Sequence, residues 1–116
     1  MDAERLTQFA TAWQRGDVES LMSFVTDDCV YVTTTGPEPG TAFAGREDVR
    51  RGFTDMLATD DGSVVEFATP QVFGDHGLLE WSQQARDGKL LARGCDVFEF
   101  EGDRVRRKDA FRKVFG

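Results

Sequence analysis

Three side chains of this 116-residue sequence combine acid–base chemistry with strand-like surroundings: Asp96, Asp109 and Tyr31. In residues 93–100, alternate positions of the predicted strand share one face, so Asp96 looks the same way as Phe98. Desolvation opposes a charged carboxylate on an apolar surface, so such an acid is paired, hydrogen-bonded or used in chemistry. We therefore predict that Asp96 acts as a general acid/base, or donates a hydrogen bond to a developing oxyanion.

Two predicted hairpins give Asp96 its expected neighbours. A two-residue turn at Asp87-Gly88 sets Leu79 opposite Asp96, and one at Gly102-Asp103 sets Asp109 opposite Asp96. Opposed residues on one face have Cβ atoms about 4.5–5.5 Å apart, so two carboxylates would share a site and one would hold its proton. A bulge in either strand would break this pairing.

The other candidate residues are bulky or hydroxylated side chains that we expect to line a ligand pocket. Tyr31 shares its strand face with Thr33, so its hydroxyl could enter that pocket and assist Asp96. The alternative is a core tyrosine whose hydroxyl contacts solvent. The predicted pocket residues are Trp13, Phe9, Thr33, Phe53, Leu57, Leu79, Trp81, Phe98 and Phe111.

The composition limits the classes of molecule that this protein is expected to bind. Fourteen basic and 21 acidic residues give a formal charge of -7, which argues against nucleic acid and anionic membranes. No apolar run has the length of a membrane span or a leader, so a cytoplasmic protein is expected. A small apolar molecule with a carbonyl or hydroxyl group is the expected ligand.

The residues that most often bind metals are sparse. Cys29 and Cys95 lack metal-ligand spacing and are interpreted as free thiols, and His76, the sole histidine, is placed in an exposed turn. We therefore expect no metal site and no cofactor. The basic residues of the last strand could attract an anion but are interpreted as a salt-bridged surface facing acidic neighbours: Arg104, Arg106, Arg107, Lys108, Arg112 and Lys113.

The elements expected to position these residues form one α+β domain over residues 1–116. Apolar periodicity predicts helices over residues 3–15, 18–25 and 46–59, the second capped by Asp17 and the third ended by Asp60-Asp61-Gly62. Strands are predicted over residues 29–35, 63–74, 77–84, 90–100 and 104–114, with a loop over 36–45. Helices first and a meander last favour helices packed on one face of a curved antiparallel sheet.

Four segments of the sequence together resemble a known family. They are residues 9–17, 25–31, 45–49 and 96–102. They resemble the nuclear-transport-factor-2-like (NTF2-like) superfamily, in its SnoaL-like and ketosteroid-isomerase-like branch, over nearly the whole chain. The resemblance implies a cystatin-like cone of curved sheet and three helices around an apolar pocket, usually in a homodimer.

The resemblance also implies roles for individual residues. Asp96 matches the aspartate that ketosteroid isomerases keep protonated to donate a hydrogen bond to an enolate oxygen. Those enzymes also use a tyrosine and a base aspartate, at positions that hold Phe9 and Thr33 here. Asp109 resembles an aspartate of limonene-epoxide-hydrolase-like members, and the SnoaL-like cyclases need chiefly one acid/base aspartate, a role that Asp96 could fill.

Two functions follow as hypotheses of comparable weight. The first is a cofactor-independent isomerase, cyclase or dehydratase in which Asp96 transfers a proton next to a carbonyl, assisted by Asp109 and Tyr31. The second is a module that binds a hydrophobic metabolite, or dimerises, without catalysis.

Overall fold

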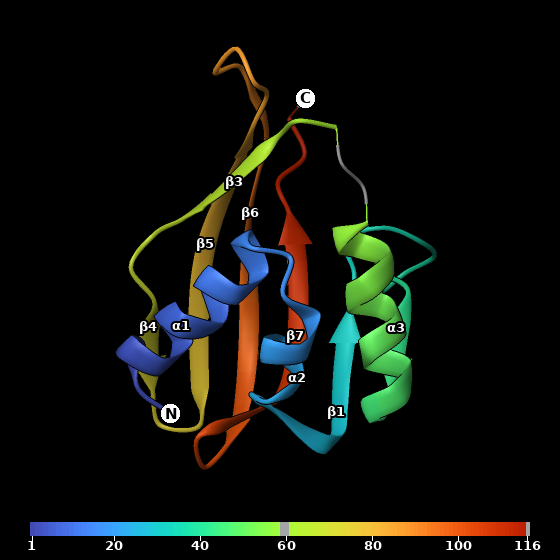
Figure 1. Cartoon of the computed structure of the whole chain (residues 1–116), viewed down its shortest axis with the longest axis vertical. Coiled ribbons are helices and arrows are strands. Elements are labelled where there is room, and N and C mark those ends of the chain that lie inside the picture. Colours follow the sequence, from blue (N-terminus) through green and yellow to red (C-terminus); the bar gives the residue numbers. More distant parts are fainter. Residues whose placement is uncertain (59–60, 116) are drawn as a thin grey trace.

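The computed structural model describes residues 1–58 and 61–115 (Figure 1). The helices are α1 (Ala3–Gln14), α2 (Val18–Met22) and α3 (Arg46–Leu57). The strands are β1 (Val25–Val32), β2 (Ala42–Ala44), β3 (Val64–Phe67), β4 (Gln71–Phe73), β5 (His76–Gln84), β6 (Leu90–Glu101) and β7 (Arg104–Arg112).

The first two helices begin at aspartates that cap them. The Asp2 side chain accepts a hydrogen bond from the backbone N–H of Arg5 at the start of α1, and Asp17 does the same for Ser20 in α2. Gly16 separates the two helices with a φ of 65°, a left-handed conformation that suits glycine. The sequence predicted both starts.

Within the described residues, seven strands form one open sheet in the order β2-β1-β7-β6-β5-β3, with β4 also paired to β5. The three helices lie on one face of this sheet (Figure 1). All pairings among these strands are antiparallel except that of β1 with β7, which is parallel. A parallel pair needs a long connection, and here β2, α3 and β3–β6 lie between the two strands in the chain. The α+β architecture with a curved sheet is thus confirmed, with one parallel pair.

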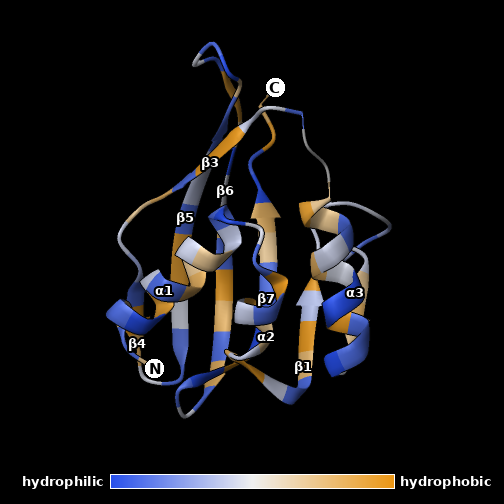
Figure 2. Ribbon diagram, in the orientation of Figure 1, coloured by the Kyte–Doolittle hydropathy of each residue, from blue (hydrophilic) through white to orange (hydrophobic). Residues whose placement is uncertain are grey.

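The core lies between the helices and the inner face of the sheet. Its centre is a cluster of aromatic rings in which Phe9 of α1 packs edge-on against Phe24, Phe53 and Phe98, with ring centroids 5.7–6.4 Å apart. Figure 2 shows apolar segments of α1, α3 and the central strands meeting there, whereas the tip joining β5 to β6 is hydrophilic.

Several element boundaries differ from the prediction, among them the end of the second helix, which is at Met22 and not at residue 25. β1 begins at Val25, four residues before the predicted start at residue 29, and runs through Asp27 and Asp28. Both aspartates are exposed, at a bulge in the β1–β7 pairing. The single strand expected over residues 63–74 is two strands, interrupted around Pro70, which cannot donate to a ladder. β2 lies inside the predicted loop, and Thr59 and Asp60, expected at the end of α3, lie outside the described residues.

The hairpin registers decide which side chains share the inner face. β5 and β6 pair as expected, with Leu79 opposite Asp96. β6 and β7 begin as expected at Phe100 and Val105, but the register then shifts by one residue, so that Ala110, and not Asp109, lies opposite Asp96. A bulge in β7 causes this shift.

Candidate functional site

A buried ion pair lies at the centre of the candidate site. The Lys108 ammonium Nζ is 3.2 Å from Oδ2 of Asp96, and each side chain is only 5% exposed. The other carboxylate oxygen, Oδ1, accepts a 3.0 Å hydrogen bond from the indole Nε1–H of Trp81. A carboxylate taken out of water needs such partners, and Asp96 has one on each oxygen.

Strand alternation brings these three side chains together. The inner face carries Trp81 of β5, Asp96 of β6, and Lys108 and Ala110 of β7. Asp96 lies opposite Ala110, so the long Lys108 side chain reaches it diagonally from the next inner position. Trp81 reaches Asp96 from the other side, lying against Gly94, its cross-strand partner. A Cβ at residue 94 would collide with the Trp81 ring, so glycine is required there.

Aromatic rings complete the surroundings of Lys108. Its Nζ lies 4.3 Å from the centroid of the Trp13 ring on α1 and 4.7 Å from that of Tyr31 on β1. Rings at these distances attract a cation through their quadrupole, most strongly where water is excluded. Lys108 is therefore held by one carboxylate and two π faces, which fixes the ammonium in place.

Tyr31 offers a hydroxyl to the same site. Its side chain lines the cavity described below, and among residues 1–58 and 61–115 it makes no hydrogen bond. Because no described buried polar atom lacks a partner, the Tyr31 hydroxyl must reach cavity solvent. Burial, and secondarily the Asp96 carboxylate, raise the pKa of Tyr31 above its usual value, so the phenol stays a hydrogen-bond donor at neutral pH.

These groups face an open cavity of about 800 Å³. It forms where the inner face changes from large to small side chains, because Phe98 and Phe100 fill one half of β6, whereas Ala92 and Gly94 occupy the other. The lining is mixed rather than purely apolar, since it includes charged residues besides the rings.

The predicted pocket residues divide into two groups. Trp13, Leu57 and Trp81 line the cavity, together with the predicted catalytic residues Tyr31 and Asp96. The other predicted pocket residues do not line it: Phe9, Phe53, Leu79, Phe98, Thr33 and Phe111.

Packing and hydrogen bonding explain why these residues lie outside the cavity. Phe9, Phe53, Leu79 and Phe98 are at most 1% exposed, because they fill the core beneath the cavity. The buried Thr33 hydroxyl donates to the backbone carbonyl of Thr35, beyond the end of β1.

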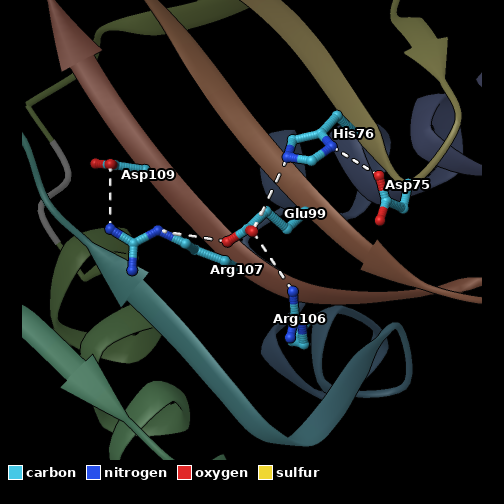
Figure 3. A network of polar contacts seen from close by, with 6 residues as sticks. All are labelled: Asp75, His76, Glu99, Arg106, Arg107 and Asp109. Atoms are coloured by element: carbon cyan, nitrogen blue, oxygen red, sulfur yellow. Dashed lines mark hydrogen bonds and ion pairs between the residues drawn. The ribbon is translucent and has the colours of Figure 1, made fainter.

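Asp109 and Phe111 lie on the opposite face of the sheet, because the β7 bulge turns odd-numbered residues outward. Asp109 Oδ2 lies 3.4 Å from an Arg107 nitrogen, and Arg107 in turn pairs with Glu99. Figure 3 shows this network on the face away from the helices, extending to His76. The predicted pairing of Asp96 with Asp109 is therefore wrong, and Asp109 does not line the cavity.

Lys108 is the site residue that the sequence analysis missed. It was assigned to a salt-bridged surface with its basic neighbours, since the expected register turned it outward. The bulge replaces the expected contact of Asp96 with Asp109 by a contact of Asp96 with Lys108. The bulged register is favoured because opposite charges attract, whereas two buried carboxylates repel. The sequence does contain one indication of this arrangement, the small residue Ala110. A small side chain opposite Asp96 leaves space for the long side chain of Lys108, two residues away on the same face of β7.

The remaining sequence-predicted groups lie away from this site. Cys29 and Cys95 are free thiols, and His76 is exposed beside Asp75. Across residues 1–58 and 61–115, no three histidine, cysteine or acidic side chains gather as metal ligands do. No helix in that part of the chain is long and apolar enough to span a membrane.

The helix-covered open sheet places the chain in the NTF2-like, cystatin-like class of α+β folds, as solved structures confirm. It superposes with a TM-score of 0.80 on an NTF2-like protein of unknown function from Mesorhizobium loti, at 25% identity over 97% of this chain and 90% of that one. An uncharacterised cystatin-fold protein from Novosphingobium aromaticivorans gives 0.74 at 25% identity, covering 95% and 97%.

A third neighbour shows the fold alone. It is a candidate isomerase of the SnoaL-like family from Agrobacterium tumefaciens, with a TM-score of 0.72 at 17% identity, covering 96% of this chain and 99% of that one. No curated protein matches this chain in sequence. The profile of the SnoaL-like domain matches residues 6–108, so the chain belongs to the SnoaL-like domain family, as the sequence resemblance predicted.

Proposed function

We propose that the chain is a cofactor-independent enzyme that binds a small molecule bearing a carbonyl or hydroxyl group and moves a proton next to that group. The observation that carries this proposal is the pair of Asp96 and Lys108, buried at one end of a solvent-connected cavity. A fixed base, an ammonium and a hydroxyl donor within one cavity are the groups that enolisation needs.

In the proposed mechanism, Asp96 removes a proton from the carbon next to the substrate carbonyl. The electron pair of that C–H bond moves into the carbonyl, and the developing enolate oxygen accepts hydrogen bonds from the Tyr31 hydroxyl and the Lys108 ammonium. Asp96 then returns its proton to the same or another carbon of the enolate, which completes an isomerisation or prepares a cyclisation. Trp81 holds the carboxylate in position through its indole N–H.

The test is hydrogen exchange on simple ketones in D₂O, followed by proton NMR. Acetophenone and cyclohexanone exchange the hydrogens beside the carbonyl whenever an enolate forms, so the final product need not be known. We expect the wild-type protein to accelerate exchange and Asp96→Asn to reduce the acceleration by at least about 10²-fold. Tyr31→Phe removes one oxyanion donor and should also cost about 10²-fold.

The matched control is Asp109→Asn, which makes the same chemical change on the opposite face of the sheet. It should leave exchange within about twofold of wild type. Equal exchange rates for the wild-type protein and Asp96→Asn would remove Asp96 from the mechanism.

A binding module without catalysis is the second candidate. It is favoured by the fact that both Asp96 oxygens already have a partner, since Oδ1 accepts a hydrogen bond from Trp81 and Oδ2 forms an ion pair with Lys108. A carboxylate with both partners in place can have the purely structural role of holding Trp81 and Lys108 in position around a bound ligand. Native mass spectrometry of the freshly purified protein distinguishes the candidates, because a module should retain a small molecule that is chemically unchanged after prolonged incubation.

We also propose that a second copy of the chain covers the outer face of the sheet. No described helix covers this face, which carries the half-buried Leu78, Cys95 and Val97 beside Phe111, which is 54% exposed. Light scattering after size exclusion should give a dimer for wild type and a monomer for Phe111→Asp. A wild-type monomer at every concentration would contradict this proposal.

A further inference from the structure

Among the residues that the structure describes, the side chains that line the cavity carry more positive than negative charge. In the described part of the chain, five charged side chains line it: Arg15, Asp61, Asp96, Lys108 and Arg112. Asp96 is paired with Lys108, and the Asp61 carboxylate accepts a hydrogen bond from the backbone of Ser63. Among residues 1–58 and 61–115, no acidic side chain lies within 4.0 Å of the Arg15 or Arg112 guanidinium.

Of the 11 arginines in the sequence, five have an acidic side chain within 4.0 Å among residues 1–58 and 61–115. The arginines with an acidic partner are Arg5, Arg50, Arg51, Arg106 and Arg107. Six others have no such partner in this part of the chain: Arg15, Arg46, Arg86, Arg93, Arg104 and Arg112. Of these six, Arg15 and Arg112 line the cavity. The nearby Asp17 is occupied as the cap of α2, where it accepts two hydrogen bonds from Ser20.

The two arginines lie at the solvent end of the cavity, whereas Asp96 and Lys108 lie at its buried end. Lys108, Ala110 and Arg112 are alternate residues on the inner face of β7, and four residues of strand span about 13 Å. The small side chain of Ala110 leaves the space between the two cations open. Arg15 and Arg112 are both exposed, so their guanidinium groups can close on a ligand from solvent.

We propose that the ligand of this cavity is an elongated keto acid, with its carbonyl at Asp96 and Lys108 and a carboxylate roughly 10 Å away, bound by Arg15 and Arg112. The substrate class rests on the proposed function, because the carbonyl end is taken from it. Guanidinium groups hold carboxylates through paired N–H donors, which gives the distal group a defined position. An anionic ligand also restores the charge balance of the cavity.

The experiment compares 4-(4-acetylphenyl)butanoate with its methyl ester, which has the same ketone and ring but no charge. Both tryptophans of the chain, Trp13 and Trp81, line the cavity, so quenching of intrinsic fluorescence reports binding directly. We expect the wild-type protein to bind the acid at least about 10-fold more tightly than the ester, with a ratio that falls as salt is added.

The variants assign this preference to the two arginines. Arg15→Gln and Arg112→Gln should each lower the ratio by about 3- to 5-fold, as expected for a solvent-exposed ion pair, and the double variant should bring it near 1. Arg104→Gln, the control, makes the same charge change outside the cavity and should leave the ratio unchanged.

Equal binding of acid and ester to wild type would overturn the anionic preference while leaving the cavity as a ligand site. An equal loss in Arg104→Gln and Arg112→Gln would also overturn it, because the effect would then be one of net charge. If the protein binds the acid selectively but does not exchange its acetyl hydrogens, the anion-binding inference is supported. The same result contradicts the proposed enzymatic function. Failure of both compounds to bind would overturn the two proposals together.

Discussion

Removing the Lys108 ammonium is the perturbation for which the structure makes its sharpest stability prediction. Lys108→Met keeps a long apolar side chain between Trp13 and Tyr31 but leaves the Asp96 carboxylate, 5% exposed, facing no cation. Breaking a buried pair by removing one partner costs about 3–5 kcal/mol, because the remaining charge stays desolvated. That is a large fraction of the stability of a domain of this size.

The reverse variant should cost less. Asp96→Asn leaves Lys108 without its counter-ion, but the two rings still attract the ammonium, and the amide oxygen can still accept from Trp81. We expect Asp96→Asn to lower the free energy of unfolding by about 2–3 kcal/mol, less than the loss of a partner that leaves the other charge without any compensation. In the double variant neither charge remains, so its cost should be smaller than that of Lys108→Met alone, as double-mutant cycles of buried pairs require.

Urea unfolding followed by tryptophan fluorescence measures all four proteins of this cycle. The control is Arg107→Met, which breaks the adjacent pair with Asp109 on the outer face, where the side chains are 38% and 21% exposed. Its cost should stay below about 1 kcal/mol. If Lys108→Met cost no more than Arg107→Met, or if the two inner substitutions were simply additive, the pair would not be buried and coupled as described.

Two further predictions concern the surroundings of the site. Gly94→Ala should lose about 1–3 kcal/mol in urea unfolding and shift the tryptophan emission, because the new methyl group would collide with Trp81 and with the Phe111 carbonyl; an unaltered emission spectrum would count against this packing. Burial raises the pKa of the Cys29 thiol, so in a Cys95→Ser background a thiol reagent should label it slowly until the pH passes its usual value of 9.0 or urea is added. Rapid labelling of the folded protein at pH 8 would show that Cys29 is accessible.

Much of the fold was predictable from local chemistry. The caps at Asp2 and Asp17 and the β5–β6 turn depend on residues that are close together in sequence. The helix starts and the pairing of Leu79 with Asp96 therefore agree with the prediction. Asp96 was recognisable for the same reason, as a carboxylate within an apolar alternation.

The partner of Asp96 was not predictable, because it depends on one bulged residue. A shift by one position turns a whole strand over, and it replaced Asp109 and Phe111 on the inner face with Lys108 and Ala110. The alternation of β7 is weak, since both of its faces carry charged residues. The choice between them depends on the buried charge of Asp96, a contact between strands that the local sequence of β7 does not contain.

The measurement that tests the central claim most directly is the indole N–H resonance of Trp81 in ¹H–¹⁵N spectra. Trp81 donates to Asp96 and has no contact with Asp109, which lies on the other face of the sheet. The structure predicts that Asp96→Asn moves this resonance and that Asp109→Asn leaves it in place. A resonance that responds to Asp109→Asn, or ignores Asp96→Asn, would show that a different carboxylate occupies the cavity.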